Sequence, residues 1–277
     1  MTKRIIKLTL EYDGTDFAGW QLQPNDRTVQ GVLEVALERL LKRPVRISGS
    51  GRTDAGVHAT GQVCSFEVEE SLPVRAFREG LNPLLPMDVV VKEAQEAPEG
   101  FHARHSARGK RYQYRVLTNR LHAPIRDRYV WWQRHPWNFE LLQQATLPLL
   151  GEHDFSSFRA SSCQALQPWR IMREIEVVRV ADEIWLTFTG TAFLKHMVRN
   201  LVGTLAEVAK GNRDLSWVKE VLEAKDRTLA GPTAPPQGLT LLEVFYESAA
   251  DKSAAPIVKS AADFAETEAD LSAGKHG

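Results

Sequence analysis

The order in which hydrophobic residues change their spacing restricts the fold of this chain more than any other feature. From Ile6 to Tyr12 every second residue is apolar or aromatic, which predicts a strand at 4–12. From Thr28 the apolar residues recur at helical spacing as far as Leu41, with Thr28 in the position of an N-cap. Further segments indicate strands at 45–49, 62–68 and 89–94, and a helix at 73–81. The order strand–helix–strand–strand–helix–strand is that of a split βαβ, or ferredoxin-like, unit.

The second half of the chain repeats this order with insertions. It contains strand patterns at 111–117, 171–180, 184–189 and 239–245, an extended piece at 129–132, and helix patterns at 139–150, 193–210 and 215–224. Two such units in tandem indicate an α+β fold in which two domains meet around a cleft. The repeat rests on element order, because the halves share no obvious sequence identity.

We therefore predict an N-terminal domain at 1–105 and a C-terminal domain at 106–247. The remaining residues, 248–277, are rich in alanine, mixed in charge and contain one aromatic residue, Phe264. This composition predicts a disordered or loosely attached tail. A short amphipathic helix at 257–265 is the competing interpretation.

Composition places the chain among ordinary soluble globular proteins, with 43% hydrophobic and 25% charged residues in 277. The two cysteines, Cys64 and Cys163, fit no CxxC pattern, which argues against a secreted disulfide scaffold and favours the reducing cytoplasm. No segment has the uninterrupted apolar run of a signal peptide or a membrane span.

Positive charge is concentrated in one stretch although the net charge is zero. Between Phe101 and Arg134 there are nine Lys or Arg residues and one acid, Asp127. The same stretch carries stackable rings, at His102, His105, Tyr112, Tyr114 and His122. Guanidinium groups beside such rings suit RNA, while a solvated charged strand and loop remains the alternative on charge alone.

A glycine-rich loop at 49–58 presents one arginine, Arg52, and one acid, Asp54. Its spacing matches neither a Walker loop nor a GxGxxG fingerprint, and no helical pattern opens directly after it, so a phosphate-cradling loop fits poorly. From these residues alone two interpretations stay open. The loop is either a tight turn whose Asp54 bonds its own backbone, or a functional loop that presents a carboxylate.

Two further elements carry candidate residues. Tyr112 and Tyr114 share one face of a strand, where they either fill the core or stack on a base. In the helical segment 193–205, Arg199 lies on a second stripe behind the buried one, and a buried guanidinium needs a carboxylate partner. His196 lies on the same stripe, and we expect it to form hydrogen bonds rather than bind a metal.

Five segments together closely resemble the TruA family of tRNA pseudouridine synthases (tRNA pseudouridine synthase I). They occur in family order between about residue 5 and residue 246, at 11–21, 51–59, 101–114, 151–159 and 193–203. The loop Gly-Arg-Thr-Asp-Ala-Gly-Val-His at 51–58 is highly specific for the family. Its presence with the other four segments makes coincidence negligible.

The resemblance implies the pseudouridine synthase fold. Two RRM-like or ferredoxin-like domains would then share a central mixed, mostly antiparallel sheet, with an active-site cleft between them. It implies an isomerase that converts uridine to pseudouridine at positions 38, 39 and 40 of the tRNA anticodon stem-loop, by base flipping and an aspartate nucleophile. It also implies a cytoplasmic homodimer that binds tRNA and uses no metal and no organic cofactor.

The resemblance assigns roles to matched positions. Asp54 becomes the nucleophile, Arg199 the partner of its carboxylate, Tyr112 the residue that packs on the target base, and Arg52 the residue that helps to extrude that base. Other matched or basic positions are expected to contact RNA: Phe101, His102, Ala103, Arg104, His105, Lys110, Arg111, Arg120, Arg159, Ser162, Cys163, Gln164, Ala165 and Leu166.

Two rival hypotheses follow from the same residues. A non-catalytic protein built from two RRM-like domains would bind RNA without Asp54, but the chain has no RNP1-like aromatic run. A metal-dependent hydrolase would use Asp54, His58, His102 and His105, whose spacing is not that of metal ligands.

Overall fold

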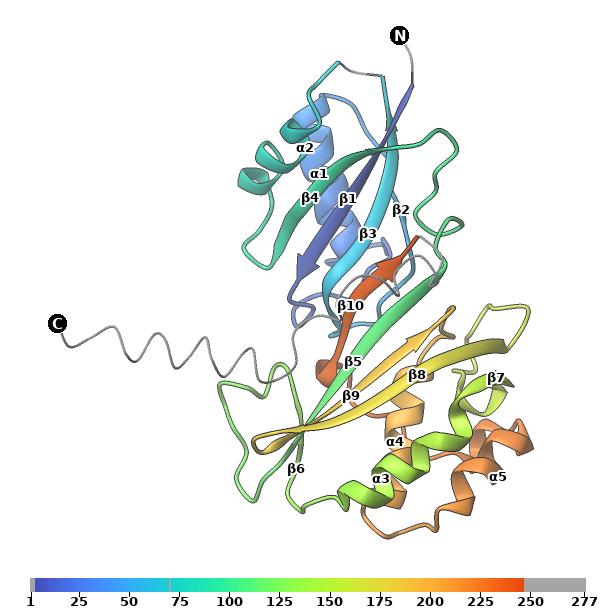
Figure 1. Ribbon diagram of the computed structural model, residues 1–277. Helices are drawn as coiled ribbons and strands as arrows, with labels where there is room; N and C mark the ends of the chain where they lie inside the picture. Colours follow the sequence, from blue (N-terminus) through green and yellow to red (C-terminus); the bar gives the residue numbers. More distant parts are fainter. Residues whose placement is uncertain (1–2, 70, 247–277) are drawn as a thin grey trace, which may run out of the picture. The chain divides into compact units, whose positions relative to one another are not determined.

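A ten-stranded sheet runs through both halves of the chain (Figure 1). The computed structural model describes residues 3–69 and 71–246. The strand order is β4-β1-β3-β10-β5-β9-β8-β7, with β2 paired to β3 and β6 paired to β5. The predicted tail at 248–277, with its alternative helix, lies outside the described residues.

The elements have the following bounds. The strands are β1 (Arg4–Tyr12), β2 (Ser48–Gly49), β3 (His58–Val68), β4 (Val89–Ala97), β5 (Gly109–Thr118), β6 (Trp131–Gln133), β7 (Gly151–Asp154), β8 (Trp169–Val180), β9 (Glu183–Gly190) and β10 (Leu239–Phe245). The helices are α1 (Val29–Leu41), α2 (Arg75–Glu79), α3 (Phe139–Thr146), α4 (Met197–Ala209) and α5 (Ser216–Ala224).

The last strand, β10, joins the two halves of the sheet. It pairs in parallel with β3 of the first half, Thr240 lying opposite His58, and antiparallel with β5 of the second half, Leu241 lying opposite Tyr112. The neighbouring pairs β1–β3, β1–β4, β5–β9, β8–β9 and β7–β8 are all antiparallel. The predicted α+β fold with a mixed, mostly antiparallel sheet is confirmed.

Local sequence signals set the ends of several elements as predicted. The Thr28 side chain accepts a hydrogen bond from the Gly31 amide at the start of α1, and Lys42 ends that helix in the left-handed conformation. Strands β1 and β10 have the predicted bounds. The predicted helix at 139–150 ends as an α-helix at Thr146, and Pro148 lies in the 3₁₀ turn that follows.

Other predicted elements were wrong in extent. Only Ser48–Gly49 of the predicted strand 45–49 pairs with β3, although Val45 and Ile47 are buried. The predicted helix at 73–81 is reduced to α2. The helix predicted from residue 193 begins only at Met197, because His196 adopts a left-handed backbone conformation with a φ of 62°. Strand β7 was not predicted.

Helices cover the sheet in each half and bury its apolar side chains. In the first half α1 and α2 accompany strands β1, β3 and β4, and in the second half α3, α4 and α5 accompany β7, β8 and β9 (Figure 1). Leu8 of β1, Leu33 of α1, Phe188 of β9 and Leu205 of α4 are all fully buried. Within residues 3–69 and 71–246 no helix combines the length and apolarity needed to cross a membrane.

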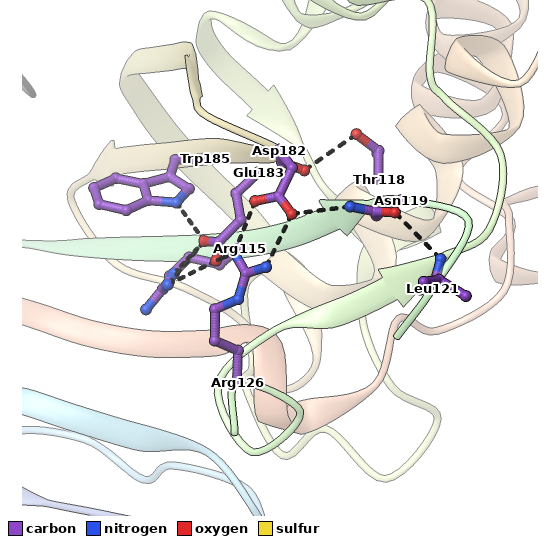
Figure 2. Close-up of polar contacts among 8 residues, drawn as sticks. All are labelled: Arg115, Thr118, Asn119, Leu121, Arg126, Asp182, Glu183 and Trp185. Carbon is purple, nitrogen blue, oxygen red and sulfur yellow. Dashed lines mark hydrogen bonds and ion pairs between the residues drawn. The ribbon is translucent and has the colours of Figure 1, made fainter. Parts of the chain in front are cut away.

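A polar network fixes the loop 119–128 to the turn between β8 and β9 (Figure 2). Glu183 accepts two hydrogen bonds from the Arg115 guanidinium, at 2.8 and 3.0 Å, and one from Arg126 at 2.9 Å. Arg126 also donates to both carboxylate oxygens of Asp182, at 2.7 and 2.9 Å. The Arg126 hydrogen bond lowers the pKa of Asp182 to about 2, so the pair stays charged at neutral pH.

We predict that Glu183→Ala destabilises the fold by about 3 kcal/mol, because the Glu183 side chain is only 4% exposed and bridges two guanidinium groups. Urea unfolding of the full chain, followed by tryptophan fluorescence, measures this cost. The matched control is Glu223→Ala, which removes an exposed pair with Lys219 and should cost less than about 0.5 kcal/mol. Equal losses in the two variants would contradict a structural role for the network.

Candidate active site

The loop between β2 and β3 carries Asp54, and residues of β3 hold its first residues by hydrogen bonds. The Ser50 amide donates to the carbonyl of Val63 at 2.7 Å. Gln62, which is fully buried, accepts a hydrogen bond from the Ser50 hydroxyl at 2.7 Å and donates to the Gly51 carbonyl at 3.1 Å. Satisfied buried polar groups of this kind fix a backbone in one conformation.

The segment 13–20 braces the same loop from the side. The Trp20 amide donates to the Thr53 carbonyl at 3.1 Å. Gly19 has a φ of +100°, and a Cβ atom there would lie 2.7 Å from the Thr53 oxygen. A Cβ at Gly14 would overlap the Val57 carbonyl. The sequence identified this segment as a matching motif, but only the contacts reveal that its glycines allow it to support the Asp54 loop.

Asp54 forms an ion pair with Arg199, a residue of α4 in the other half of the chain. The Arg199 Nη1 atom lies 3.1 Å from Asp54 Oδ2, and Arg199 Nε donates to the Ala234 carbonyl at 2.8 Å. The two side chains are 23% and 13% exposed for Asp54 and Arg199. A turn does exist, since the Val57 amide donates to the Asp54 carbonyl at 3.2 Å, but it uses the backbone of Asp54 and leaves the carboxylate to Arg199.

His196 faces the same carboxylate. Its Nε2 atom lies 3.5 Å from Asp54 Oδ2, and its left-handed backbone places it at the N-terminal end of α4. Burial lowers the pKa of His196, and the cations Arg199, Lys195 and Arg227 act in the same direction against the opposing effect of Asp54. The ring is therefore neutral at pH 7. This backbone conformation is less common for side chains other than glycine, and histidine is among the residues that adopt it more often.

Asn200 and Gly203 follow Arg199 on α4 and pack against the segment 227–234. Asn200 is fully buried and donates to the Phe158 carbonyl at 2.8 Å, while its own oxygen accepts from Thr233 at 2.6 Å. A Cβ at Gly203 would overlap the Pro232 carbonyl. The glycine one turn after Arg199 therefore makes room for a neighbouring backbone.

The two tyrosines of β5 have different surroundings. Tyr114 is fully buried, and its hydroxyl donates to the Pro235 carbonyl at 2.7 Å, so it belongs to the core. Tyr112 keeps 7% exposure and packs edge-on against Phe193, with ring centroids 5.0 Å apart. Burial, followed by Tyr12 and the negative charge of Asp54, raises the pKa of Tyr112. Tyr112 therefore keeps its proton at neutral pH.

Arg52 and the segment 161–166 lie together beside this site. Arg52 is exposed, and its Nη1 atom is 3.5 Å from the Gln164 side-chain oxygen. Ser162 accepts a hydrogen bond from Lys195 at 3.0 Å, Leu166 is 95% exposed, and Cys163 and Ala165 are half-buried. Two segments that the sequence assigned separately to RNA binding are therefore neighbours.

The predicted RNA-contacting stretch 101–105 divides into exposed and structural residues. Arg104 and His105 are exposed. Phe101 packs on the Tyr246 ring at 4.9 Å, and His102 accepts hydrogen bonds from the backbone of its own turn. Ala103 is fully buried, with its amide bonded to the Ser65 hydroxyl, so its side chain forms no part of a surface.

The basic residues predicted to contact RNA are also not equivalent. Arg120 is exposed and Arg159 half-buried. Arg111 lies on the face of β5 opposite Tyr112, where it donates to Thr189 at 3.1 Å, so the fold does not bring it toward Asp54. Lys110 lies on the same face as Tyr112 and donates to the Ser50 carbonyl at 3.0 Å.

The histidines of the rival metal-site hypothesis have other partners. His58 Nδ1 lies 3.0 Å from the Gly14 amide and 3.1 Å from Asp13 Oδ1, and its Nε2 lies 2.8 Å from the Arg128 carbonyl, so both ring nitrogens have partners within the protein. Burial lowers the pKa of His58 against the opposing effect of Asp13. Among the residues that the structure describes, no group of three or more His, Cys, Asp or Glu side chains is arranged to hold a metal ion.

Comparison with known proteins identifies the family. The family model described as tRNA pseudouridine synthase matches residues 9–106 and 145–247. The tRNA pseudouridine synthase A of Myxococcus xanthus is 53% identical over 242 residues, covering 87% of this chain and 91% of the relative. The enzymes of the same name from Geotalea daltonii and Legionella pneumophila (strain Corby) are 46% and 43% identical, covering 88% and 87% of this chain and 100% and 92% of the relatives.

The loop that carries Asp54 and the arginine paired with it, Arg199, thus belong to a chain that these enzymes match along most of its length. The chain belongs to the tRNA pseudouridine synthase family, a family of isomerases. The resemblance predicted from its five segments is confirmed, and a non-catalytic RNA-binding protein is not favoured.

Proposed function

We propose that this protein isomerises uridine to pseudouridine at positions 38, 39 and 40 in the anticodon stem-loop of tRNA, with Asp54 as the nucleophile. The ion pair between Asp54 and Arg199, 3.1 Å long and formed across the two halves of the chain, is the observation that carries this proposal. The named relatives support tRNA as the substrate. Family resemblance supports the positions in the anticodon arm, a homodimer and a cytoplasmic location.

The reaction requires a charged carboxylate. The C1′–N1 bond of uridine breaks, the uracil turns and a C1′–C5 bond forms, while C5 loses a proton and N1 gains one. Attack on C1′ and attack on C6 of the ring both need Asp54 in its ionised form. The Arg199 guanidinium, 3.1 Å from Asp54 Oδ2, binds and orients the negatively charged carboxylate, which is the function that we assign to Arg199.

The target base must also leave the helix before it can turn, because a stacked and paired base has no room to rotate. Arg52, exposed two residues before Asp54, suits this step. Its guanidinium can occupy the vacated space or hold the displaced phosphate. Exposed cations, including Arg104 and Arg120, would bind the backbone of the tRNA.

Tyr112 is proposed to hold the uracil ring near the sugar while the glycosidic bond is broken. We expect Tyr112→Phe to keep kcat within about 10-fold of the wild type, because the ring remains, and Tyr112→Ala to lower kcat by about 10- to 100-fold, since base–aromatic stacking contributes about 1–3 kcal/mol. Single-turnover kinetics on tRNA measure both, with melting temperatures to control for folding. An equal loss in the two variants would assign the catalytic contribution to the hydroxyl instead.

The release of the C5 proton provides a direct assay. Incubation of the purified protein with a tRNA transcript carrying tritium at C5 of uridine should release tritium into water as turnover proceeds. The same release in excess EDTA is expected for chemistry without a metal. Absence of release by a folded, tRNA-binding protein would reject the proposed isomerisation, and loss of release in EDTA would favour a metal-dependent reaction.

A further inference from the structure

We infer that Lys110 is a positioning residue for this site: its ammonium group holds the Ser50 carbonyl at the start of the loop that carries Asp54. This inference rests on the proposed function and adds a residue to it. It assigns Lys110 a different task from the RNA contact that the basic stretch predicts.

The backbone of Lys110 is held between two neighbouring strands of the sheet. It lies on β5, paired with Val244 of β10 on one side and with Gly190 of β9 on the other. Side chains two residues apart on a strand point to the same face, so Lys110 and Tyr112 lie next to each other on β5. A movement of β5 therefore moves Lys110 together with Tyr112, the residue proposed to hold the uracil ring.

The Lys110 side chain reaches from this strand to the loop that carries Asp54. Its Nζ atom donates to the Ser50 carbonyl at 3.0 Å and comes so close to Gly51 that a Cβ atom there would overlap it. A side chain at Gly51 would therefore displace the ammonium group from this position. The contact lies four residues before Asp54.

The backbone of this loop is otherwise held mainly from the first half of the chain, whereas Arg199 and Gln164 of the second half contact the side chains of Asp54 and Arg52. Gln62 holds Ser50 and Gly51, the Tyr12 hydroxyl lies 2.8 Å from the Thr53 hydroxyl, and the Trp20 amide holds the Thr53 carbonyl. Lys110 instead ties the loop to the strand of Tyr112. It thereby sets the distance between the nucleophile and the residue proposed to hold the base, and a misplacement of about 1 Å in such a site can cost about 100-fold in rate.

The charge of Lys110 is sensitive to its surroundings. Burial, reinforced by the nearby Arg104 guanidinium, lowers the pKa of Lys110 to about 8. Within the described residues no carboxylate forms an ion pair with it. The ammonium form, present below about pH 8, makes a stronger hydrogen bond to a carbonyl than the neutral amine that replaces it at higher pH.

The first test separates positioning from RNA binding. Lys110→Met should lower kcat by about 10- to 100-fold, while the Kd for tRNA changes by less than about 3-fold and its salt dependence keeps the wild-type slope. A lysine on the RNA backbone would behave in the opposite way, because losing one phosphate contact weakens binding and reduces the slope by about 1. That result, or an unchanged kcat, would overturn the inference.

A matched control and a conservative variant sharpen the comparison. Lys92 also donates to a backbone carbonyl, that of Thr60 at 2.9 Å, but it is exposed and lies on β4, so Lys92→Met should leave kcat unchanged. Lys110→Arg, whose charge persists at alkaline pH, should recover most of the lost rate. In the wild type kcat should fall as the pH rises through about 8, and in Lys110→Arg this fall should move to higher pH.

The outcomes distinguish the inference from the function on which it rests. An inactive wild type would reject both. An active wild type whose alkaline fall in kcat is unchanged by Lys110→Arg would reject the role of Lys110 and leave the isomerisation in place. Should Lys110→Met fail to fold, the pH profiles of the wild type and Lys110→Arg carry the test.

Discussion

Asp54→Ala is expected to abolish pseudouridine formation, with kcat reduced by at least about 10⁴-fold, while tRNA binding stays within about 3-fold of the wild type. The reason is that removal of a covalent nucleophile leaves only binding and orientation to act on the substrate. Asp54→Asn, which keeps the shape but not the charge, should be equally inactive. Single-turnover tritium release and a filter-binding Kd measure the two effects.

The folding control for these variants comes from the site itself. Asp54 is 23% exposed and its loop is held mainly through backbone atoms, so neither substitution should lower the melting temperature enough to explain a loss of activity. Normal turnover by Asp54→Asn would refute the nucleophile role. Loss of tRNA binding in both variants would mean instead that the carboxylate organises the RNA site.

Arg199→Met is expected to lower kcat by about 100-fold. The substitution removes a hydrogen bond between charged groups, at 3.1 Å, and leaves the Asp54 carboxylate without its guanidinium, at a cost of about 1.5–3 kcal/mol. Arg199→Lys keeps the charge and should recover part of the rate. Single-turnover kinetics at saturating tRNA measure the chemical step rather than binding.

Arg199 also has a structural contact that must be separated from catalysis. Its Nε atom holds the Ala234 carbonyl at 2.8 Å, so Arg199→Met should reduce the melting temperature as well. If kcat fell in proportion to the loss of folded protein alone, Arg199 would be a structural residue. A folded Arg199→Met enzyme with the rate of the wild type would contradict the proposed pairing.

The strands and helices were largely predictable because their signals are local. The alternation at 4–12 and the Thr28 cap each depend on neighbouring residues, and β1 and α1 have the predicted character. Strand β7 escaped prediction because it is defined by pairing with β8 rather than by its own four residues. The strand predicted at 45–49 was too long because Val45 and Ile47 are buried. Alternating buried residues resemble a strand in sequence whether or not they pair with one.

The site was predictable only through residues far apart in the chain. The backbone of Asp54 does form a turn, through its carbonyl and the Val57 amide. The neighbouring residues therefore allowed both a structural turn and a loop that presents a carboxylate. The contact that distinguishes them comes from Arg199, 145 residues away. The opposite faces of Lys110 and Arg111 follow from strand geometry, but the direction of Lys110 toward Ser50 depends on how β5 lies against the first half.

We propose that Asp54, paired with Arg199, acts as the nucleophile in the isomerisation of uridines in the anticodon arm. The most direct test of this proposal is incubation of the wild type and Asp54→Asn with an unmodified tRNA transcript, followed by mapping of pseudouridine at single-nucleotide resolution. We expect new pseudouridine at positions 38, 39 or 40 with the wild type, wherever the transcript has uridine there, and none with Asp54→Asn. Pseudouridine confined to other positions, or formed equally by Asp54→Asn, would contradict the proposal.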